Sequence, residues 1–256
     1  MSAGFCSLEG RTALVTGGSR GIGLMIAEGF VEAGATVYIS SRKADVCDQA
    51  AAELSKKGKC VSLPADCGTE KGCRFLAEQL ASREPALHVL VNNAGANWGA
   101  PIEEYPDAAF EKVLALNVTA TFRLTVSLLP QLRAASAPGD PARVINIGSI
   151  DGLGVPLLET YAYSTSKAAL HHLTRHLARR LAPEITVNAV APGPFESKMM
   201  AVTLERFGDA IRSSNPLRRI GEPEDMAGVA LYLASRAGAY VNAAVIPVDG
   251  GISGTR

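Results

Sequence analysis

Residues 12–23 of the chain read TALVTGGSRGIG, from Thr12 to Gly23. Apolar and β-branched residues open this segment, glycines follow, and apolar residues then recur at helical spacing at Met25, Ile26 and Phe30. The pattern predicts a strand, a tight glycine turn and a helix. Such a turn lets the backbone approach a pyrophosphate, whose charge then meets the N–H groups and the dipole of the helix start. The spacing is Gly-x-x-x-Gly-x-Gly rather than Gly-x-Gly-x-x-Gly, so this turn alone is weak evidence for a dinucleotide site.

Further apolar, often β-branched runs follow along the chain, with helical patterns between them. Alternation of strand and helix predicts a parallel sheet that helices cover on both faces. The order of the motifs described below favours one α/β domain over residues 1–256, although the length alone would allow two. The predicted strands lie near residues 12–15, 36–39, 61–63, 88–91, 144–147, 186–190 and 244–248.

Charge and composition exclude several classes of protein. The 256 residues include 25 Lys and Arg and 25 Asp and Glu, so no net field would attract nucleic acid or an anionic membrane. The first residues lack a basic segment followed by an apolar one, and no apolar run reaches the length of a membrane span, which predicts a soluble cytoplasmic protein. The five cysteines are odd in number and form no Cys-x-x-Cys pair, as expected for free thiols rather than a disulfide or a metal site.

A tyrosine and a lysine four residues apart form the central chemical motif. Tyr163 and Lys167 share one face of a predicted helix, and Ser149 ends a predicted strand 14 residues before the tyrosine. Bringing a phenol from its usual pKa of about 10 to neutrality takes roughly 4 kcal/mol. One unit charge at ~4 Å in an effective dielectric of ~20 supplies about that much before desolvation is subtracted. Lys167 alone is therefore barely sufficient, and a positively charged oxidised nicotinamide would supply the remainder. A second phenol, Tyr161, is followed four residues later by Thr165, and we interpret it as a pocket or packing residue.

Other motifs occur in order around these three residues, namely Asn92-Asn93-Ala94-Gly95, Asn117 and Pro192-Gly193. With them, the chain resembles the short-chain dehydrogenase/reductase family over about residues 8–251. The resemblance implies a single-domain, doubly wound (Rossmann) seven-stranded parallel sheet. It also implies that Tyr163 is the general acid or base, that Lys167 tunes it and holds the nicotinamide ribose, and that Ser149 polarises the carbonyl oxygen. Asn117 matches the relay asparagine of the family, although its own context is equally typical of helix capping or core hydrogen bonding. The interval from serine to tyrosine is commonly 13 residues in the family, so the loop 151–160 contains an insertion.

The end of the second predicted strand indicates which nicotinamide the site takes. NAD-preferring sites place a carboxylate there for the ribose 2′-hydroxyl, whereas this chain has Ser40-Ser41-Arg42-Lys43. Arg42 suits a 2′-phosphate, and Arg20 matches a second basic position of NADP-preferring relatives, so we predict NADP(H). The alternative is that Arg42 and Lys43 form the solvated first turn of a helix. Asp66 matches the adenine-contacting acid of the family, or else it is a helix cap or turn residue. The predicted cofactor contacts are Gly17, Ser19, Arg20, Gly21, Ile22, Gly23, Arg42, Asp66, Asn93, Ala94, Gly95, Tyr163, Lys167, Pro192 and Gly193.

The substrate is less well defined by the sequence. The segment 194–216 corresponds to the mobile lid of the family, and its apolar side chains (Phe195, Met199, Met200, Leu204 and Phe207) suit a hydrophobic substrate, or else a core helix. We predict that the pocket is lined by Trp98, Leu153, Val155 and Phe195, with Leu157 beside them. The residues of these motifs resemble those of the 3-oxoacyl (β-ketoacyl) reductase branch of the family, rhamnolipid-type enzymes included. The ends of the helices that carry Asn117 and Tyr163 lack the bases that meet an acidic carrier protein, which leaves coenzyme A esters, free carbonyls and alcohols open.

The expected activity is therefore NADPH-dependent reduction of a carbonyl to a secondary alcohol. An alcohol, sugar or steroid dehydrogenase of the same family is the alternative, and a non-catalytic NADP-binding sensor or scaffold is an alternative of another class. The leucine stripe of the Tyr163 helix predicts core packing, and the resemblance implies a homodimer or homotetramer. His172 and His176 are spaced like a metal pair but lack an accompanying Glu, so we place them on an exposed face or a subunit contact and expect no metal.

Overall fold

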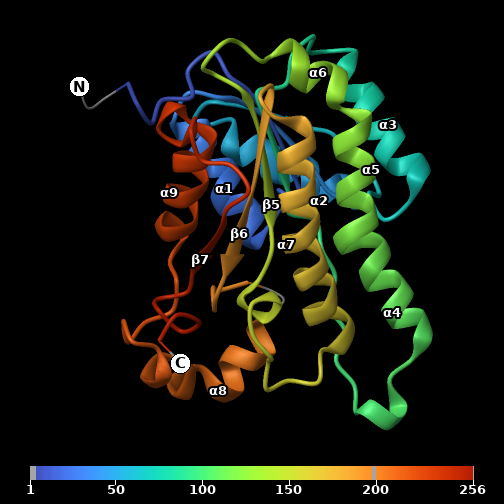
Figure 1. Cartoon of the computed structure of the whole chain (residues 1–256), viewed down its shortest axis with the longest axis vertical. Helices are drawn as coiled ribbons and strands as arrows, with labels where there is room; N and C mark the ends of the chain where they lie inside the picture. The colour runs from blue at the N-terminus through green and yellow to red at the C-terminus, as the bar shows by residue number, and fades with distance from the viewer. Residues whose placement is uncertain (1–3, 198–199, 256) are drawn as a thin grey trace.

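The structure, a computed structural model, describes residues 4–197 and 200–255. Its strands are all parallel and form one sheet in the order β3-β2-β1-β4-β5-β6-β7 (Figure 1). They are β1 Thr12–Thr16, β2 Thr36–Ser40, β3 Lys59–Ser62, β4 Val89–Asn92, β5 Ala142–Ile147, β6 Ile185–Pro192 and β7 Val245–Val248. The predicted seven-stranded, doubly wound, single-domain fold is confirmed, and each predicted strand is present within a few residues of its expected position.

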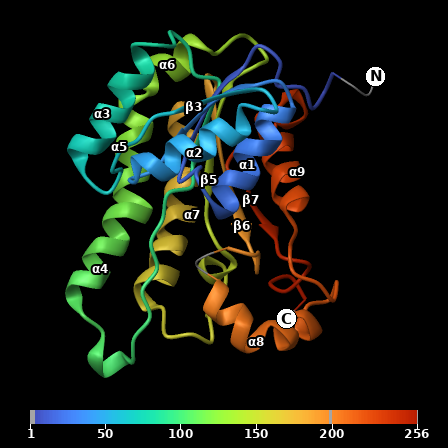
Figure 2. The same ribbon diagram turned by 180° about the vertical axis from the view of Figure 1, so that it is seen from behind.

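Helices cover both faces of the sheet (Figures 1 and 2). The first core contains side chains of α1, α2 and α9, and the second contains side chains of α3, α5 and α7. Successive strand residues alternate between these two cores: Ala13 and Val15 lie in the first, and Leu14 lies in the second. The helices are α1 Gly21–Glu32, α2 Ala44–Leu54, α3 Glu70–Ala81, α4 Asp107–Leu114, α5 Ala120–Ser127, α6 Leu129–Ala134, α7 Tyr161–Leu181, α8 Ala201–Ser214 and α9 Pro223–Ala234.

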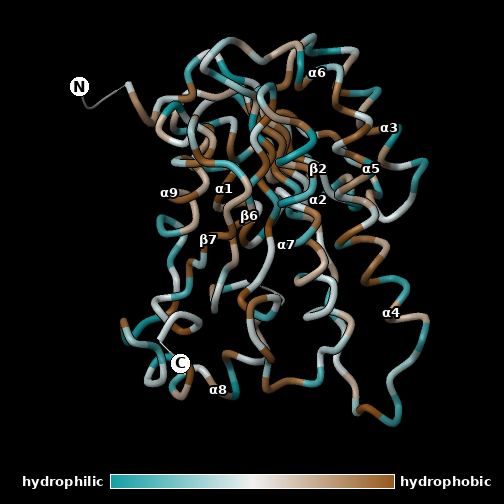
Figure 3. The backbone as a smooth tube through the Cα atoms, in the orientation of Figure 1, coloured by the Kyte–Doolittle hydropathy of each residue, from teal (hydrophilic) through white to brown (hydrophobic). Residues whose placement is uncertain are grey.

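The hydropathy of the chain follows this layering. Figure 3 shows brown, apolar segments concentrated in the central strands and lighter or teal segments towards the periphery. A strand buried on both faces needs no polar side, so β1, β4, β5 and β6 are buried along their whole lengths. Within the described residues, none of the helices combines the length and the apolar character needed to cross a membrane.

The strand order changes direction between β1 and β4, which are neighbours in the sheet. In open sheets of this kind, ligands bind outside the carboxyl ends of the strands at such a switch point. The connections at these ends include the glycine turn after β1, the loop after β4 and the short 3₁₀ turn η3 (Ile150–Gly152) after β5. Helix α8, which follows β6, lies across the same end of the molecule (Figure 1).

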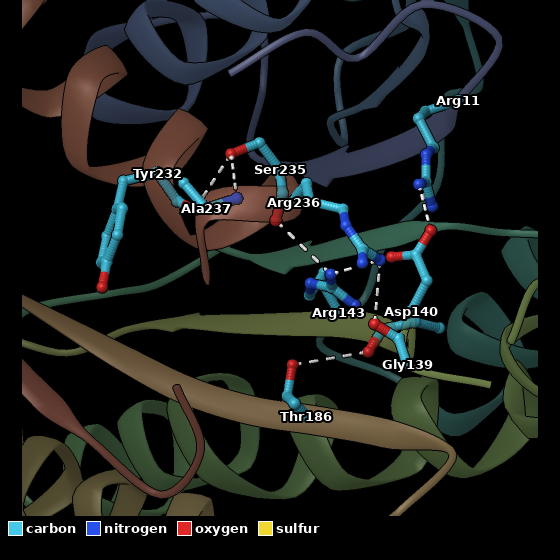
Figure 4. A network of polar contacts seen from close by, with 10 residues as sticks. Arg11, Gly139, Asp140, Arg143, Thr186, Tyr232, Ser235, Arg236 and Ala237 are labelled. Atoms are coloured by element: carbon cyan, nitrogen blue, oxygen red, sulfur yellow. Dashed lines mark hydrogen bonds and ion pairs between the residues drawn. The ribbon is translucent and has the colours of Figure 1, made fainter. Parts of the chain in front are cut away.

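The opposite end of the sheet contains a partly buried ion pair, Arg143 with Asp140 (Figure 4). Arg143, near the start of β5, has a side chain only 3% exposed, and it donates to Asp140 at 3.0 Å and to the Ser235 carbonyl oxygen at 3.4 Å. Asp140 also pairs with Arg11, and Arg236 donates to the Gly139 carbonyl oxygen. These contacts join the residues before β1 and β5 to the C-terminal end of α9.

Candidate active site

The glycine turn brings β1 directly onto the start of α1. Gly17 and Gly21 both have positive φ, at 65° and 53°, a conformation that glycine adopts without a steric penalty. A Cβ on Gly23 would lie 2.3 Å from the Gly17 carbonyl oxygen, so only glycine fits there. The side chain of Arg20, the N-cap residue, does not cap α1, and the first turn contains no acidic residue. The turn therefore fits the pyrophosphate of a dinucleotide, because the first N–H groups of α1 are left to bind it.

The loop after β4 is fastened to this turn by side-chain hydrogen bonds. Asn93 donates from Nδ2 to the carbonyl oxygens of Thr16 (2.9 Å) and Gly17 (3.2 Å). The Thr16 hydroxyl accepts from the backbone N–H groups of Asn93 and Ala94, each at 3.0 Å. These contacts give Asn93 a positioning role, since its amide holds the backbone of the glycine turn.

Residues 41–43, which follow β2 and would meet an adenosine 2′-phosphate, include no carboxylate. Ser40 ends β2, and Arg42 and Arg20 are both exposed, neither taking part in an ion pair with another described residue. Two free guanidinium groups beside the glycine turn suit a phosphate. Asp66, after β3, is exposed and accepts a hydrogen bond from the Gly68 N–H at 3.0 Å, so it already acts as a turn residue.

Ser149 leaves the end of β5 as the N-cap of η3. Its side chain is almost fully buried, and its Oγ accepts from the Asp151 N–H at 3.2 Å. The Ser149 side chain also lies close enough to the Tyr163 phenol to lower its pKa. The strand end and the helix start therefore bring these two residues together as predicted.

Helix α7 supplies the phenol and the ammonium. Lys167 is buried, its Nζ donates to the Ile147 carbonyl oxygen at 2.7 Å, and the same atom lies 5.4 Å from the centroid of the Tyr163 ring. Tyr161, by contrast, donates its hydroxyl to Glu159 at 3.0 Å and packs its ring against Tyr105. The structure thus gives Tyr161 the packing role predicted for it.

The pKa of the phenol differs from the expectation that Lys167 would bring it towards neutrality. Burial raises the pKa of Tyr163 to about 12, the nearby Ser149 hydroxyl opposes this rise, and the Asp151 charge adds to it. Burial also lowers the pKa of Lys167 to about 8, against the opposing effect of Asp151. Burial disfavours both charged forms, because the ammonium and the phenolate each lose solvation. The resting site therefore holds a neutral phenol beside an ammonium at neutral pH.

Asn117 lies on a single π-helical turn, η2 (Ala115–Thr119), between α4 and α5. Its Oδ1 accepts from the Ala96 N–H at 2.8 Å, and its Nδ2 donates to the Ala96 carbonyl oxygen and to the Ser166 hydroxyl. Asn117 therefore satisfies the core contacts expected from its own context, and it also fastens the loop after β4 to α7. Turns of this kind often mark functional sites. The sequence carries no signal for the turn.

Two residues near the catalytic centre were missed by the sequence analysis. Asp151 lies two residues after Ser149, and its charge acts on both Tyr163 and Lys167. His171, one turn after Lys167, is buried against η3, and burial lowers its pKa to about 4. A Cβ on Gly148 would lie 2.1 Å from His171 Nε2. The sequence signal for His171 was the pair of glycines on either side of Ser149, Gly148 and Gly152. Glycines at these positions leave room for a bulky side chain from another element to pack against the turn.

The predicted pocket residues separate into two groups. Leu153 and Trp98 are about half exposed, and Val155 is 96% exposed in the loop before α7. The Ala100 N–H donates to the Glu159 carbonyl oxygen, so the loops that carry Trp98 and Val155 lie side by side. Phe195, in contrast, is 2% exposed and belongs to the first core.

The burial of Phe195 corrects its assignment to the pocket. A Cβ on Gly221 would lie 2.4 Å from the Phe195 ring, because this glycine leaves the space that the ring fills. Elsewhere in the predicted lid, Phe207 of α8 is 53% exposed and Ser197 lies near Gly21 of the glycine turn. Met199, also assigned to the lid, lies outside the described residues.

The remaining predicted positions lie where the strands end. Gly193 follows β6 directly, and a Cβ on it would lie 2.6 Å from Asp249 Cβ. Gly95 faces the catalytic centre, since a Cβ there would lie 3.3 Å from Asn117 Oδ1 and 3.8 Å from Lys167 Nζ. His172 and His176 are exposed on α7, and within residues 4–197 and 200–255 no group of three His, Cys, Asp or Glu side chains could hold a metal ion.

The doubly wound sheet, the uncapped glycine turn and the adjoining Ser149, Tyr163 and Lys167 define the class of nicotinamide-dependent oxidoreductases. Within that class, the chain belongs to the short-chain dehydrogenase/reductase family. The family model described as "Enoyl-(Acyl carrier protein) reductase" matches residues 17–253.

Relatives in this family include reductases of acyl thioesters. A rhamnolipids biosynthesis 3-oxoacyl-[acyl-carrier-protein] reductase of Pseudomonas aeruginosa is 50% identical over 250 residues, which are 96% of this chain and 98% of the relative. The 3-oxoacyl-[acyl-carrier-protein] reductase FabG of Aquifex aeolicus is 34% identical over 248 residues, covering 96% and 98% of the two chains. The solved Pseudomonas aeruginosa RhlG/NADP active-site complex superposes with a TM-score of 0.95 at 49% identity, over 97% of this chain and 98% of that one.

Proposed function

We propose that this chain is an NADPH-dependent reductase that converts the ketone of a 3-oxoacyl thioester, or a related ketone, into a secondary alcohol. The observation that carries the proposal is the meeting of Ser149, Tyr163 and Lys167 beside an uncapped glycine turn at the switch point of the sheet. The name of the 50% identical relative and the NADP complex of the superposed structure support the substrate class and the cofactor.

The residues of the glycine turn and the loops after β2 and β4 would hold NADPH. The N–H groups at the start of α1 would bind the pyrophosphate, and Arg20 and Arg42 would pair with the 2′-phosphate. When bound, the cofactor supplies the hydride that the carbonyl carbon accepts. The lysine that would meet the nicotinamide ribose is Lys167, whose Nζ already lies beside Gly95.

The chain itself supplies the proton and polarises the carbonyl. Ser149 would donate a hydrogen bond to the ketone oxygen and keep its hydrogen, while Tyr163 delivers the one proton that this oxygen takes up as the alcohol forms. With a pKa of about 12, the Tyr163 phenol starts in the protonated form that this direction needs. The Lys167 ammonium then stabilises the phenolate that the transfer leaves behind.

An apolar rim beside this centre suits an acyl group. Trp98, Leu153, Val155 and Leu157 are exposed on the loops after β4 and before α7, and Leu157 is 98% exposed. We infer that α8 forms a lid over this rim together with Ser197, since Ser197 approaches the glycine turn and Phe207 of α8 is exposed. The acyl chain would then be covered by apolar side chains from two directions.

We further propose that the chain forms a homodimer or homotetramer and is located in the cytoplasm. Phe122 and Val126, one turn apart on α5, are 46% and 44% exposed, as expected of a face that packs against a second copy in a homodimer or homotetramer. All five cysteines are free thiols, which supports a cytoplasmic location.

The first test measures cofactor binding and turnover with the purified chain. We expect tighter binding of NADPH than of NADH, and loss of nicotinamide absorbance with acetoacetyl thioesters. Tyr163→Phe should lower kcat by about 10³-fold because it removes the proton donor, whereas NADPH binding should persist. Tight NADPH binding without turnover of any ketone or alcohol would instead favour a sensor or scaffold.

A second test addresses the 2′-phosphate. Arg42→Asp replaces the guanidinium with the carboxylate typical of NAD sites, so we expect the preference for NADPH over NADH to fall at least about tenfold. Lys43→Asp is the matched control at the neighbouring exposed position. A preference unchanged in Arg42→Asp would contradict the role assigned to Arg42.

A further inference from the structure

A carboxyl group stands in the catalytic centre without a role in the chemistry described above. Asp151 lies in η3, and its N–H donates to Ser149 Oγ at 3.2 Å. The next residue, Gly152, packs so closely on α7 that a Cβ there would lie 2.6 Å from the Lys167 carbonyl carbon. Asp151 is therefore held between the serine and the helical turn that carries the lysine.

The side chain of Asp151 is half-buried, and no described residue donates a hydrogen bond to its carboxylate oxygens. The titratable groups packed around η3 are Tyr163, Lys167 and His171, all from α7. His171 is neutral, so Lys167 is the one cation among these three groups. An unpaired carboxylate in this position places a negative charge beside Ser149 and Tyr163, the residues that would hold the ketone.

We propose that Asp151 is a specificity-determining residue, whose carboxylate favours ketones flanked by an uncharged acyl group, such as thioesters and esters, over ketones that carry a free carboxylate. The inference rests on the proposed function and names the charge of its substrate. The physical reason is repulsion between like charges a few ångströms apart in a site partly removed from water. The same charge disfavours the Tyr163 phenolate, which keeps the phenol in its proton-donating form.

The test compares kcat/KM for ethyl acetoacetate and for acetoacetate at pH 8, with NADPH, in the wild type and in Asp151→Asn. The two substrates present the same ketone and differ in the charge beside it. We expect the wild type to prefer the ester, and Asp151→Asn to reduce the ratio of ester to acid about tenfold. Asp48→Asn, which removes an exposed carboxylate on α2, is the control and should leave the ratio unchanged.

A second readout separates charge from a structural effect. In the direction of alcohol oxidation, Asp151→Asn should move the rising limb of the pH profile to lower pH, because a phenol loses its proton more easily when the neighbouring anion is removed. The ratio is measured within one preparation, so it does not depend on the fraction of folded protein, and Asp151→Ala provides a second variant.

The outcomes distinguish the two proposals. A ratio and a pH profile both unchanged in Asp151→Asn and Asp151→Ala overturn the inference while the reductase activity stands. A wild type that binds NADPH but reduces neither substrate, nor any acetoacetyl thioester, overturns the proposed function and the inference together.

Discussion

The charged, protonated form of Lys167 is disfavoured by the burial of its side chain. The side chain is 5% exposed, and one hydrogen bond from Nζ, to the Ile147 carbonyl oxygen at 2.7 Å, ties it to the end of β5. Burial lowers the pKa of this ammonium to about 8, and the Asp151 charge limits the fall. A lysine is charged below its pKa, so the ammonium is present at neutral pH and is lost as the pH rises through about 8.

This titration predicts a pH dependence for ketone reduction. We expect kcat to be level below pH 8 and to fall above it, because the neutral amine no longer stabilises the phenolate of Tyr163. The measurement is kcat at saturating NADPH and ketone from about pH 6 to pH 10, around the lysine pKa. Lys167→Arg keeps its charge over this range, so its kcat should be lower but should lack the falling limb. A wild-type profile that stays level up to pH 10 would refute this assignment.

Two elements must approach closely for the catalytic residues to meet. The turn η3 contains Asp151 and has Ser149 as its N-cap, and it packs on α7 where His171 is buried. Glycines at 148 and 152 make room for this contact, since a side chain at either position would overlap α7. The distance from serine to tyrosine therefore depends on the packing of a turn on a helix as well as on the residues themselves.

The close contact between Gly148 and His171 predicts that a methyl group added at position 148 lowers both stability and activity. Gly148→Ala places a Cβ 2.1 Å from His171 Nε2, so we expect the free energy of unfolding to fall by about 1–3 kcal/mol and kcat to fall with it as Ser149 shifts. The double variant Gly148→Ala/His171→Ala should recover part of the loss. Gly154→Ala, in the same loop but with nothing within 4 Å of its added Cβ, is the control. Equal unfolding midpoints for the Gly148 and Gly154 variants in urea would show that the contact is not tight.

The catalytic residues and the partly buried Arg143–Asp140 ion pair lie at opposite ends of the molecule. The catalytic residues gather at the carboxyl ends of the strands, and the Arg143–Asp140 pair lies at the opposite end (Figure 4). Arg143 joins β5 to the C-terminal end of α9 through the Ser235 carbonyl oxygen. A buried charge of this kind stabilises a fold only while its partner is present.

Removal of one partner should therefore cost stability and leave catalysis intact. Asp140→Ala leaves the Arg143 guanidinium buried without its carboxylate, so we expect the free energy of unfolding to fall by about 3 kcal/mol. Asp140→Ala/Arg143→Met should be more stable than the single variant, because it buries no unpaired charge. Asp209→Ala removes a surface ion pair with Arg212 and should change little. The measurements are denaturant unfolding and kcat, and a large loss of kcat in folded Asp140→Ala would show that the two ends are coupled.

The sequence by itself determined the order of the strands and helices along the chain and the identity of the catalytic side chains. Apolar periodicity is a local property, so each strand could be placed within a few residues. The sequence also predicted that three residues lie close together, namely Ser149, Tyr163 and Lys167. Parallel strands end at one edge of the sheet, and an i,i+4 pair shares one helix face.

The tertiary structure alone decided how those groups are surrounded. Phe195 fills the space beside Gly221, and Asn117 lies on a π-helical turn. The pKa of Tyr163 is raised by burial, whereas the sequence predicted that the Lys167 charge would lower it. Asp151 and His171 gained their positions from the packing of η3 on α7. Burial and electrostatic fields sum over atoms that are far apart along the chain, and no local pattern of residues contains that sum.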